Sequence, residues 1–207
     1  MPTEPPRKRA VVFVDGQNLF NHAKAAFGYG FPNYDVYKLA EYVTQLRGWD
    51  LTGVRFYSGL PDPSDARNAF WAAKMAAMGR QGVWVFSRPL RYRNKTFRLP
   101  DGTQHSFQTA EEKGIDVRIA LDVINLAHRR EYDVAVIFSQ DQDLSEVATE
   151  IRIIAQQQER WIKIACAFPS SPVSSSKRGI NGTDWIKIAR DIYEQCIDPT
   201  DYRKAIP

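Results

Sequence analysis

The feature that most constrains the fold of this 207-residue chain is a repeated alternation of short apolar runs with segments of helical periodicity. Short runs with few polar residues are typical of parallel strands that helices cover on both faces. Their alternation with helices predicts an α/β domain with a mostly parallel, five-stranded sheet. The predicted strands are "RAVVFVD" (9–15), "GVRFYSG" (53–59), "GVWVFS" (82–87), "DVAVIFS" (133–139) and "WIKIACAF" (161–168).

Helical segments separate these strands. Asp35 and Ser64 are expected to cap the helices that they precede, because a side-chain oxygen there can accept a hydrogen bond from the first helical turn. The last helix is expected to begin at Thr183 and to bury one apolar stripe of residues. That stripe contains Trp185, Ile188 and Ile192, with Cys196 as a further candidate. The other helices are expected from about residue 18 and over 35–48, 63–79, 113–130 and 143–158.

The length suffices for the core of one domain, which we expect over residues 10–198. Residues 1–9 are expected to form a disordered leader and residues 199–207 a tail. Residues 88–109 alternate in polarity and turn at "PDG", which predicts a hairpin arm inserted after the third strand. The segment 169–182 is rich in Ser, Pro and Gly, and we expect a mobile loop there.

The composition favours a cytoplasmic protein and excludes several classes. Cys166 and Cys196 are the only cysteines and lie in apolar contexts, as expected of reduced core thiols in a cytosol. Three histidines and no cysteine pair do not favour a zinc site. The N-terminus lacks the apolar region of a secretory signal, and no apolar run approaches the ~18 residues that span a bilayer. The net charge of +4 favours an anionic partner only weakly.

Four aspartates occupy positions where such a sheet presents a ligand site. Asp15 ends the first strand, and Asp141 and Asp143 follow the fourth in "FSQDQD". Asp116 lies in the first turn of the helix that precedes the fourth strand. In open α/β sheets, ligands bind outside the carboxyl ends of strands, where the strand order reverses. Clustered carboxylates suit Mg²⁺ or Mn²⁺, which can activate a water and stabilise charge on a phosphodiester.

Each acid also has a purely structural interpretation. Asp143 can cap the helix that follows it, Asp116 can be a favourable first-turn acid, and Asp15 can belong to a turn. Asp122 can form a surface pair with Arg118, four residues earlier on the same helix. The coincidence of four acids from three segments nevertheless favours a site. No partnered Ser or Cys nucleophile and no phosphate-binding "GxxxxGK[ST]" loop stands out, so metal and water would carry the chemistry.

The segments "VVFVDGQNLF", "EKGIDVRIALDV" and "VAVIFSQDQDLSEV", in this order and spacing, resemble the NYN-domain family of the PIN-like nuclease superfamily. The resemblance covers residues 10–168. It implies a PIN-like three-layer sandwich with strand order 3-2-1-4-5, helices on both faces and a metal-dependent ribonuclease site. The matching positions are Asp15 and Asn18 in "DxxN", Lys113 and Asp116 in "KxxD", Asp122 as a helical acid, and Ser139, Asp141 and Asp143 in "SxDxD".

The resemblance also implies roles for these residues. Asp15, Asp116, Asp141 and Asp143 would hold Mg²⁺ or Mn²⁺ and form the catalytic centre. Asn18 and Ser139 would orient a carboxylate, water or phosphate, Lys113 would offset negative charge, and Asp122 would support the site. The family often has Gly where Gln140 and Gln142 stand, and Phe where Leu144 stands. The two glutamines add bulk close to the metal face.

The predicted arm is strongly basic. The segment "RPLRYRNKTFR" contains five cations and no acid, interleaved with aromatic residues. Proteins that bind single-stranded nucleic acid typically place cations against the phosphates and stack aromatic rings on the bases. Such runs of charge are also common on solvated surfaces. The candidate RNA-binding residues are Arg88, Arg91, Tyr92, Arg93, Lys95 and Arg98, with Lys177 and Arg178 from the loop after the fifth strand. Phe70 and Trp71, at helical spacing among Ala and Met, are interpreted as core.

The sequence therefore predicts a divalent-metal-dependent ribonuclease that acts on single-stranded or structured RNA, with no membrane partner and with a homo-oligomer left open. A non-catalytic RNA-binding or adaptor protein on a degenerate nuclease scaffold is the alternative. A phosphatase that uses Asp15 as its nucleophile would need a second acid two residues later, and Gln17 stands there.

Overall fold

The computed structural model describes residues 2–30, 33–174 and 177–203. Residue 1 of the expected leader, residues 175–176 of the expected loop and residues 204–207 of the expected tail lie outside this part of the chain. The elements, in chain order, are β1 (Arg9–Asp15), α1 (Gly16–Phe27), α2 (Val36–Gln45), β2 (Asp50–Leu60), α3 (Arg67–Arg80), β3 (Trp84–Pro89), β4 (Arg91–Arg98), β5 (Gln104–Glu111), α4 (Ile115–His128), β6 (Val134–Phe138), η1 (Gln142–Leu144), α5 (Ser145–Gln157), β7 (Lys163–Pro169), β8 (Asp184–Ile188) and α6 (Arg190–Gln195).

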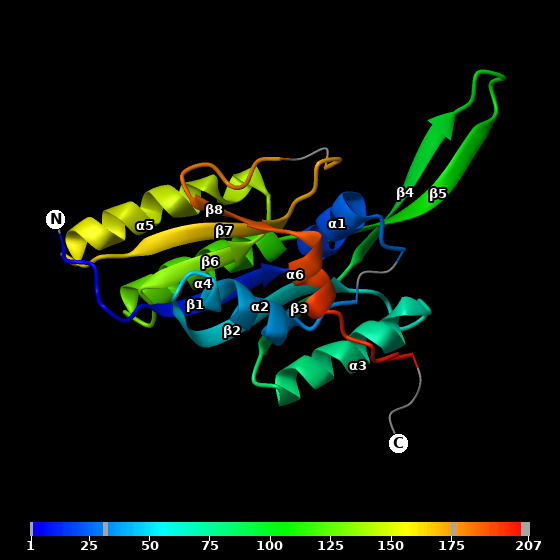
Figure 1. Ribbon diagram of the computed structural model, residues 1–207. Coiled ribbons are helices and arrows are strands. Elements are labelled where there is room, and N and C mark those ends of the chain that lie inside the picture. Colours follow the sequence, from blue (N-terminus) through cyan, green and yellow to red (C-terminus); the bar gives the residue numbers. More distant parts are fainter. Residues whose placement is uncertain (1, 31–32, 175–176, 204–207) are drawn as a thin grey trace.

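The main sheet is parallel and has the order β3-β2-β1-β6-β7-β8. The first five positions confirm the predicted order 3-2-1-4-5, and β8 adds a sixth strand at one edge. The strand order reverses between β1 and β6. The chain adds β2 and β3 on one side of β1, and it adds β6, β7 and β8 on the other side. Figure 1 shows this twisted sheet with helices on both sides. Within the described residues no helix is long and apolar enough to cross a membrane.

Alternating side chains of the central strand divide the core into two layers. Val12 and Val14 pack with α1 and α2, whereas Val11 and Phe13 pack with α4 and α5. All four are at least nine-tenths buried, as expected for a strand covered on both faces. The result is the predicted three-layer α/β sandwich, with its two cores separated by the sheet.

The predicted arm is confirmed as an antiparallel ribbon of β4 and β5, which projects away from the body of the molecule (Figure 1). It leaves the carboxyl end of β3 and returns to the start of α4. The backbone N–H of Leu90 donates to the carbonyl of Leu60, which fixes the base of the arm beside the end of β2 (2.9 Å).

The prediction of a helix beginning at Thr183 is wrong. Residues Asp184–Ile188 form β8, which pairs with β7, and the helix that follows begins only at Arg190. Ile186 and Ile188 face the core, while Trp185 is 40% exposed and donates its indole N–H to the carbonyl of Ile180. Ile188 and Cys196 are buried as expected, but they belong to different elements. The apolar residues of this short segment fit both the alternation of a strand and the stripe of a helix. The segment forms a strand because it pairs with the edge of β7.

Two helix starts also differ from expectation. α3 begins at Arg67 without a side-chain cap, because Ser64 instead forms a local turn with Asp62. α1 begins at Gly16, directly after the strand, because the Asp15 carboxylate caps it by accepting from the N–H of Asn18. A Cβ at position 16 would collide with the ring of Phe56. Glycine therefore allows the strand and the helix to join at the sheet edge. The predicted Asp35 cap of α2 is confirmed.

The pairing of β8 can be tested with two neighbouring substitutions. Ile186→Ala is expected to lower the free energy of unfolding by about 2–4 kcal/mol, since it removes a buried side chain from the strand. Lys187→Ala, on the solvent side, should change it by no more than about 0.5 kcal/mol. Urea denaturation followed by circular dichroism measures both. Equal effects of the two substitutions would contradict the strand assignment, because a helix beginning at Thr183 would place Ile186 off its apolar stripe.

Candidate active site

Carboxylates from three segments meet at the edge of the sheet where the strand order reverses. They line a cavity of about 300 Å³ beside the carboxyl ends of β1 and β6, which is the expected ligand position of an open α/β sheet. The acids of this cavity are Asp15, Glu112, Asp116 and Asp141, and the amides of Gln17, Asn18 and Asn21 complete its polar lining.

Asp15 is the most buried of these acids, with 6% of its surface exposed. One carboxylate oxygen accepts from the N–H of Asn18 (3.0 Å) and the other accepts from the hydroxyl of Ser139 (3.2 Å). Burial, with a smaller contribution from the charges of Asp141 and Asp116, raises the pKa of Asp15 to about 6, although both hydrogen bonds favour the carboxylate. The side chain is therefore held firmly in a place that disfavours its negative charge.

Asn18 and Ser139 hold the ends of β1 and β6 together. The side-chain oxygen of Asn18 accepts from the N–H of Gln140 (2.9 Å), and the hydroxyl oxygen of Ser139 accepts from the N–H of Asp141 (3.1 Å). Asp141 in turn caps η1, since its carboxylate accepts from the N–H of Asp143 (3.0 Å). This continuous network fixes the backbone around Asp15 and Asp141, and the orienting role predicted for Asn18 and Ser139 would act through it.

The structure does not bring every predicted acid into the cavity. Asp143 is exposed and outside the lining. Lys113 is also exposed and outside it, although its sequence neighbours Glu112 and Gly114 line the cavity. Asp122 is 4% exposed and accepts from the hydroxyl of Tyr57 (2.8 Å). It also pairs with Arg118 (2.7 Å) and Arg55 (3.4 Å), so the expected pair with Arg118 exists but is buried. Asp122 thus anchors α4 to the sheet and does not face the cavity.

Glu112 is the site residue that sequence reasoning missed. Its carboxylate lines the cavity and accepts from the backbone N–H of Gly59. Burial raises its pKa to about 7, and the charges of Asp15 and Asp116 contribute. An acid directly before the "KxxD" motif was the available signal. Its position depends on a contact with β2, which lies 53 residues earlier in the chain, so the local pattern could not reveal it.

The two unusual glutamines of the motif have a structural role. The side-chain amide of Gln140 donates to the carbonyl of Arg178 (2.7 Å), and that of Gln142 donates to the carbonyl of Gly179 (3.0 Å). The N–H of Asn181 donates back to Gln142 (3.2 Å). The loop after β7 is thereby tied to the start of η1. The side chains of Lys177 and Arg178 are exposed on this loop, and the Arg178 carbonyl is hydrogen-bonded to the residue before Asp141.

The basic residues of the arm are also exposed, whereas its predicted aromatic contact Tyr92 is partly buried. The hydroxyl of Tyr92 accepts from the N–H of Asp62 (2.9 Å), which fastens the ribbon to the loop before α3. Arg88 stacks over the ring of Phe86 (5.5 Å) close to Gly114. Arg93 and Lys95 both pair with Glu111 across the ribbon. The remaining predicted contacts, Arg91 and Arg98, lie on β4.

The donor chemistry of the cavity fits a hard divalent cation bound largely through water. Among the described residues, no group of three or more His, Cys, Asp or Glu side chains is arranged to hold a metal ion by itself. Mg²⁺ needs no such cage, since it usually keeps several waters and takes one or two carboxylates together with substrate phosphates. No Lys or Arg of the described chain lines the cavity, so its four carboxylates have no counter-charge there.

Removal of one carboxylate charge should stabilise the metal-free protein. A carboxyl with a raised pKa binds protons more readily in the folded chain than in the unfolded one, so stability falls as pH rises from 4.5 to about 7. Glu112→Gln keeps the acceptor for Gly59 and removes this penalty. In EDTA we expect it to raise the free energy of unfolding by roughly 1–3 kcal/mol at pH 8 and to have little effect at pH 4.

Glu111→Gln is the matched control, since the hydrogen bond from Lys95 lowers the pKa of its neighbour Glu111. This control should not be stabilising at pH 8. Denaturant titrations at the two pH values measure both variants. A Glu112→Gln protein that is no more stable than its parent at pH 8 would contradict the unfavourable charge at Glu112.

Solved structures provide the first comparison. A crystal structure of a protein of unknown function from Vibrio parahaemolyticus matches 91% of this chain and 96% of its own, with a TM-score of 0.54 and 19% identity. This likeness shows a shared fold alone. Ribokinase from Giardia lamblia has a TM-score of 0.35 at 8% identity, over 82% of this chain and 50% of that one. This similarity is too low to indicate a shared fold.

The second comparison concerns families. No curated protein matches this chain. A family model described as "NYN domain" matches residues 9–158, from the start of β1 to the end of α5. The match contains all four acids of the cavity and the whole arm. A NYN domain indicates a PIN-like nuclease, in agreement with the position of the acids. On the extent of this match, the chain belongs to the NYN domain family.

Proposed function

We propose that this protein is a divalent-metal-dependent ribonuclease whose active site is the cavity lined by Asp15, Glu112, Asp116 and Asp141. The observation that carries the proposal is the convergence of four carboxylates, without a lining cation, where the strand order of a NYN domain reverses. Such a concentration of negative charge costs stability unless a cation offsets it. An anionic phosphodiester could not approach the acids closely without that cation.

The residues of the cavity would divide the work. Asp15 and Asp141 would hold Mg²⁺ or Mn²⁺, with Asp116 and Glu112 acting directly or through waters. When bound, the metal supplies an acidified water and offsets charge on the phosphodiester. Asn18 and Ser139 keep the carboxylates in place through the hydrogen bonds that join β1 to β6. Asp143 is exposed outside the lining, so we include Glu112 in its place.

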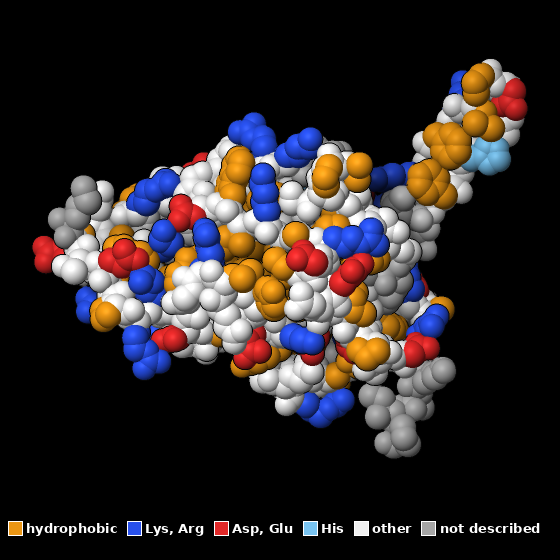
Figure 2. Space-filling view, in the orientation of Figure 1, with side chains coloured by type: hydrophobic (Ala, Val, Ile, Leu, Met, Phe, Trp, Pro, Cys, Tyr) orange, Lys and Arg blue, Asp and Glu red, His pale blue; other side chains and the backbone are white. Residues whose placement is uncertain are grey.

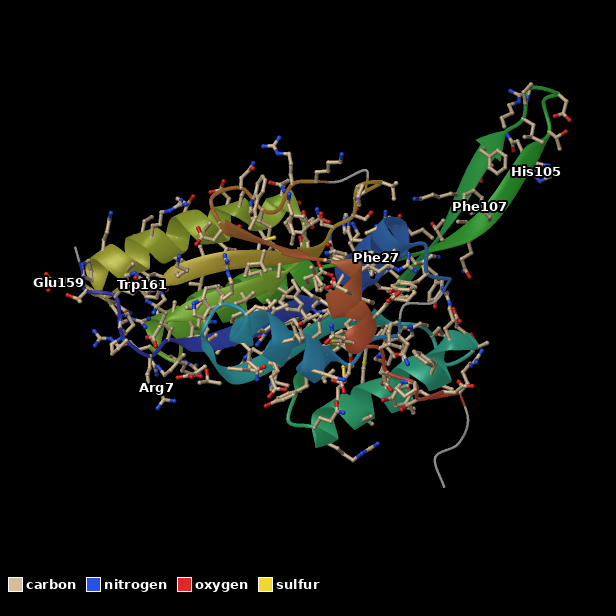
Figure 3. All side chains as sticks on the ribbon, in the orientation of Figure 1. Arg7, Phe27, His105, Phe107, Glu159 and Trp161 are labelled. Carbon is tan, nitrogen blue, oxygen red and sulfur yellow. The ribbon has the colours of Figure 1, made fainter. Side chains whose placement is uncertain are left out.

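The arm is proposed to bind the RNA, and its chemistry is concentrated on one face. Side chains alternate across a ribbon, so Arg91, Arg93 and Lys95 share a face with the aromatic residues near the tip. Phe97 is 47% exposed and Phe107 48% exposed, and His105 stacks on Phe97. Figure 3 labels Phe107 and His105 on the ribbon, and Figure 2 shows hydrophobic and histidine side chains gathered on the arm. The opposite face is mainly neutral and polar, and Tyr92 is engaged with Asp62.

A substitution at the end of β6 tests the nuclease. Asp141→Asn keeps the cap of η1 but removes a carboxylate charge, and we expect a loss of roughly 100-fold or more in Mn²⁺-dependent cleavage of labelled single-stranded RNA. Asp191→Asn, at an exposed aspartate in the first turn of α6, is the inert control. Asp143→Asn should lose less activity than Asp141→Asn. EDTA should abolish cleavage by the parent protein.

The same assay separates the rival functions. A non-catalytic RNA-binding protein would bind RNA in a salt-sensitive way and would cleave none, with or without metal. Cleavage that persists in purified Asp141→Asn protein at the parent rate would mean a contaminant or a different site. A phosphatase would instead release phosphate from monoesters, and Gln17 does not supply the second acid that this reaction needs.

Substitutions on the two faces of the arm test its role. Phe97→Ala combined with Phe107→Ala should weaken binding of single-stranded RNA by about tenfold or more, since stacking on an aromatic ring contributes about 1–3 kcal/mol per base. Asn94→Ala combined with Gln108→Ala removes an exposed cross-strand pair from the opposite face and should leave affinity unchanged. Fluorescence anisotropy in EDTA measures both. Equal losses for the two faces would argue against a binding face.

A further inference from the structure

A second cavity adjoins the acidic one and has no part in the proposed metal-dependent cleavage. It has a volume of about 870 Å³ and lies between α1, α3 and the chain segment after α6. The side chains of Gln17 and Asn21 line both cavities. The base of the arm reaches both as well, because Leu90 lines the second cavity and Glu112 the first. The two hollows are therefore neighbours along α1.

A polar stripe of α1 leads from one cavity into the other. Gln17, Asn21 and Lys24 are spaced by four and three residues, so they lie on one face of the helix, and all three are exposed. The same helix is capped at its start by Asp15, the buried acid of the first cavity. Among the described residues Lys24 forms no ion pair, whereas Arg67, at the rim of the second cavity, is engaged by Asp65 (2.6 Å).

Aromatic rings from two helices meet in this cavity, Phe20 from α1 and Trp71 from α3. The rings of Phe20 and Trp71 are in edge contact, with centroids 6.3 Å apart, and both are half-buried. Phe70 is buried, as predicted. Trp71 was also predicted to be a core residue, but only part of its surface packs on the core and the rest lines the cavity. Aromatic walls combined with a few amides and a cation are the features of pockets that hold an unstacked nucleobase and its phosphate.

We propose that this second cavity binds the base and sugar of the nucleotide that adjoins the scissile phosphate, with the base against Trp71 and Phe20 and the next phosphate near Lys24. That the neighbouring phosphate is the one cleaved rests on the proposed nuclease function, whereas binding of the nucleotide in this cavity does not. A base that occupies a cavity in the protein cannot be paired, so the substrate class is single-stranded RNA or an unpaired loop. The amides of Gln17 and Asn21 are placed between the base and the acids.

Binding of adenosine 5′-monophosphate and uridine 5′-monophosphate tests the cavity without cleavage. In EDTA, with the Asp141→Asn protein, titration should shift the indole N–H resonance of Trp71 in ¹H–¹⁵N spectra. Trp71→Leu identifies that resonance among the five tryptophans of the chain. The resonance of Trp161 should not move, since Trp161 lies at the end of the molecule opposite the arm (Figure 3).

Two variants and two matched controls complete the experiment. Lys24→Ala and Trp71→Leu should each weaken binding of a short single-stranded RNA by about tenfold. Arg80→Ala removes an exposed cation at the other end of α3, and Trp161→Leu removes another half-buried tryptophan that packs on the same core. Both controls should bind as the parent does. Lys24 is exposed, so its variant keeps the fold even if Trp71→Leu does not.

The outcomes separate this inference from the nuclease proposal. Nucleotide binding that the two cavity variants weaken would support the pocket even if the parent protein cleaves no RNA. A duplex of the same sequence that competes as well as the single strand would overturn it, as would unchanged binding in both cavity variants. Loss of cleavage in Asp141→Asn with intact pocket binding would place the two activities in neighbouring cavities.

Discussion

The candidate site depends on the position of one buried carboxylate, Asp15. Its two oxygens are occupied by the N–H of Asn18 and the hydroxyl of Ser139, so the acid joins the start of α1 to the end of β6. β1 and β6 are the strands between which the sheet order reverses. The contacts that close the sheet at this point therefore also orient the acids, and a change that loosens one will disturb the other.

The charge around Asp15 differs from that around other acids with little exposure. Asp122 is paired with two arginines, and Asp133 is paired with Arg9 and Arg160. Asp15 instead accepts hydrogen bonds from neutral groups and faces further acids across the cavity. Burial of a charge without a counter-charge is unfavourable, so a cation bound beside Asp15 would supply the counter-charge that arginines supply to Asp122 and Asp133.

The sequence was informative where one local pattern had one physical solution. Apolar runs with a parallel-sheet signature predicted five parallel strands, and "PDG" within an alternating segment predicted the arm; the order of the strands came from the family resemblance. Residues 184–188 and Glu112 could not be predicted in the same way. Residues 184–188 are too few to distinguish the periodicity of a strand from that of a helix. The position of Glu112 depends on its contact with Gly59. Both are decided by partners distant in sequence.

The proposed binding surfaces select the length and single-strandedness of a substrate more than its sequence. Stacking on Phe97, Phe107 or Trp71 accepts any base, and cations that contact phosphates carry no base code. Each contact is weak alone, but a strand that reaches from the arm across the acids to Lys24 makes them together, which multiplies affinity through effective concentration. A mononucleotide gains only one of them. Discrimination among RNAs then follows from which strands can remain unpaired over that span.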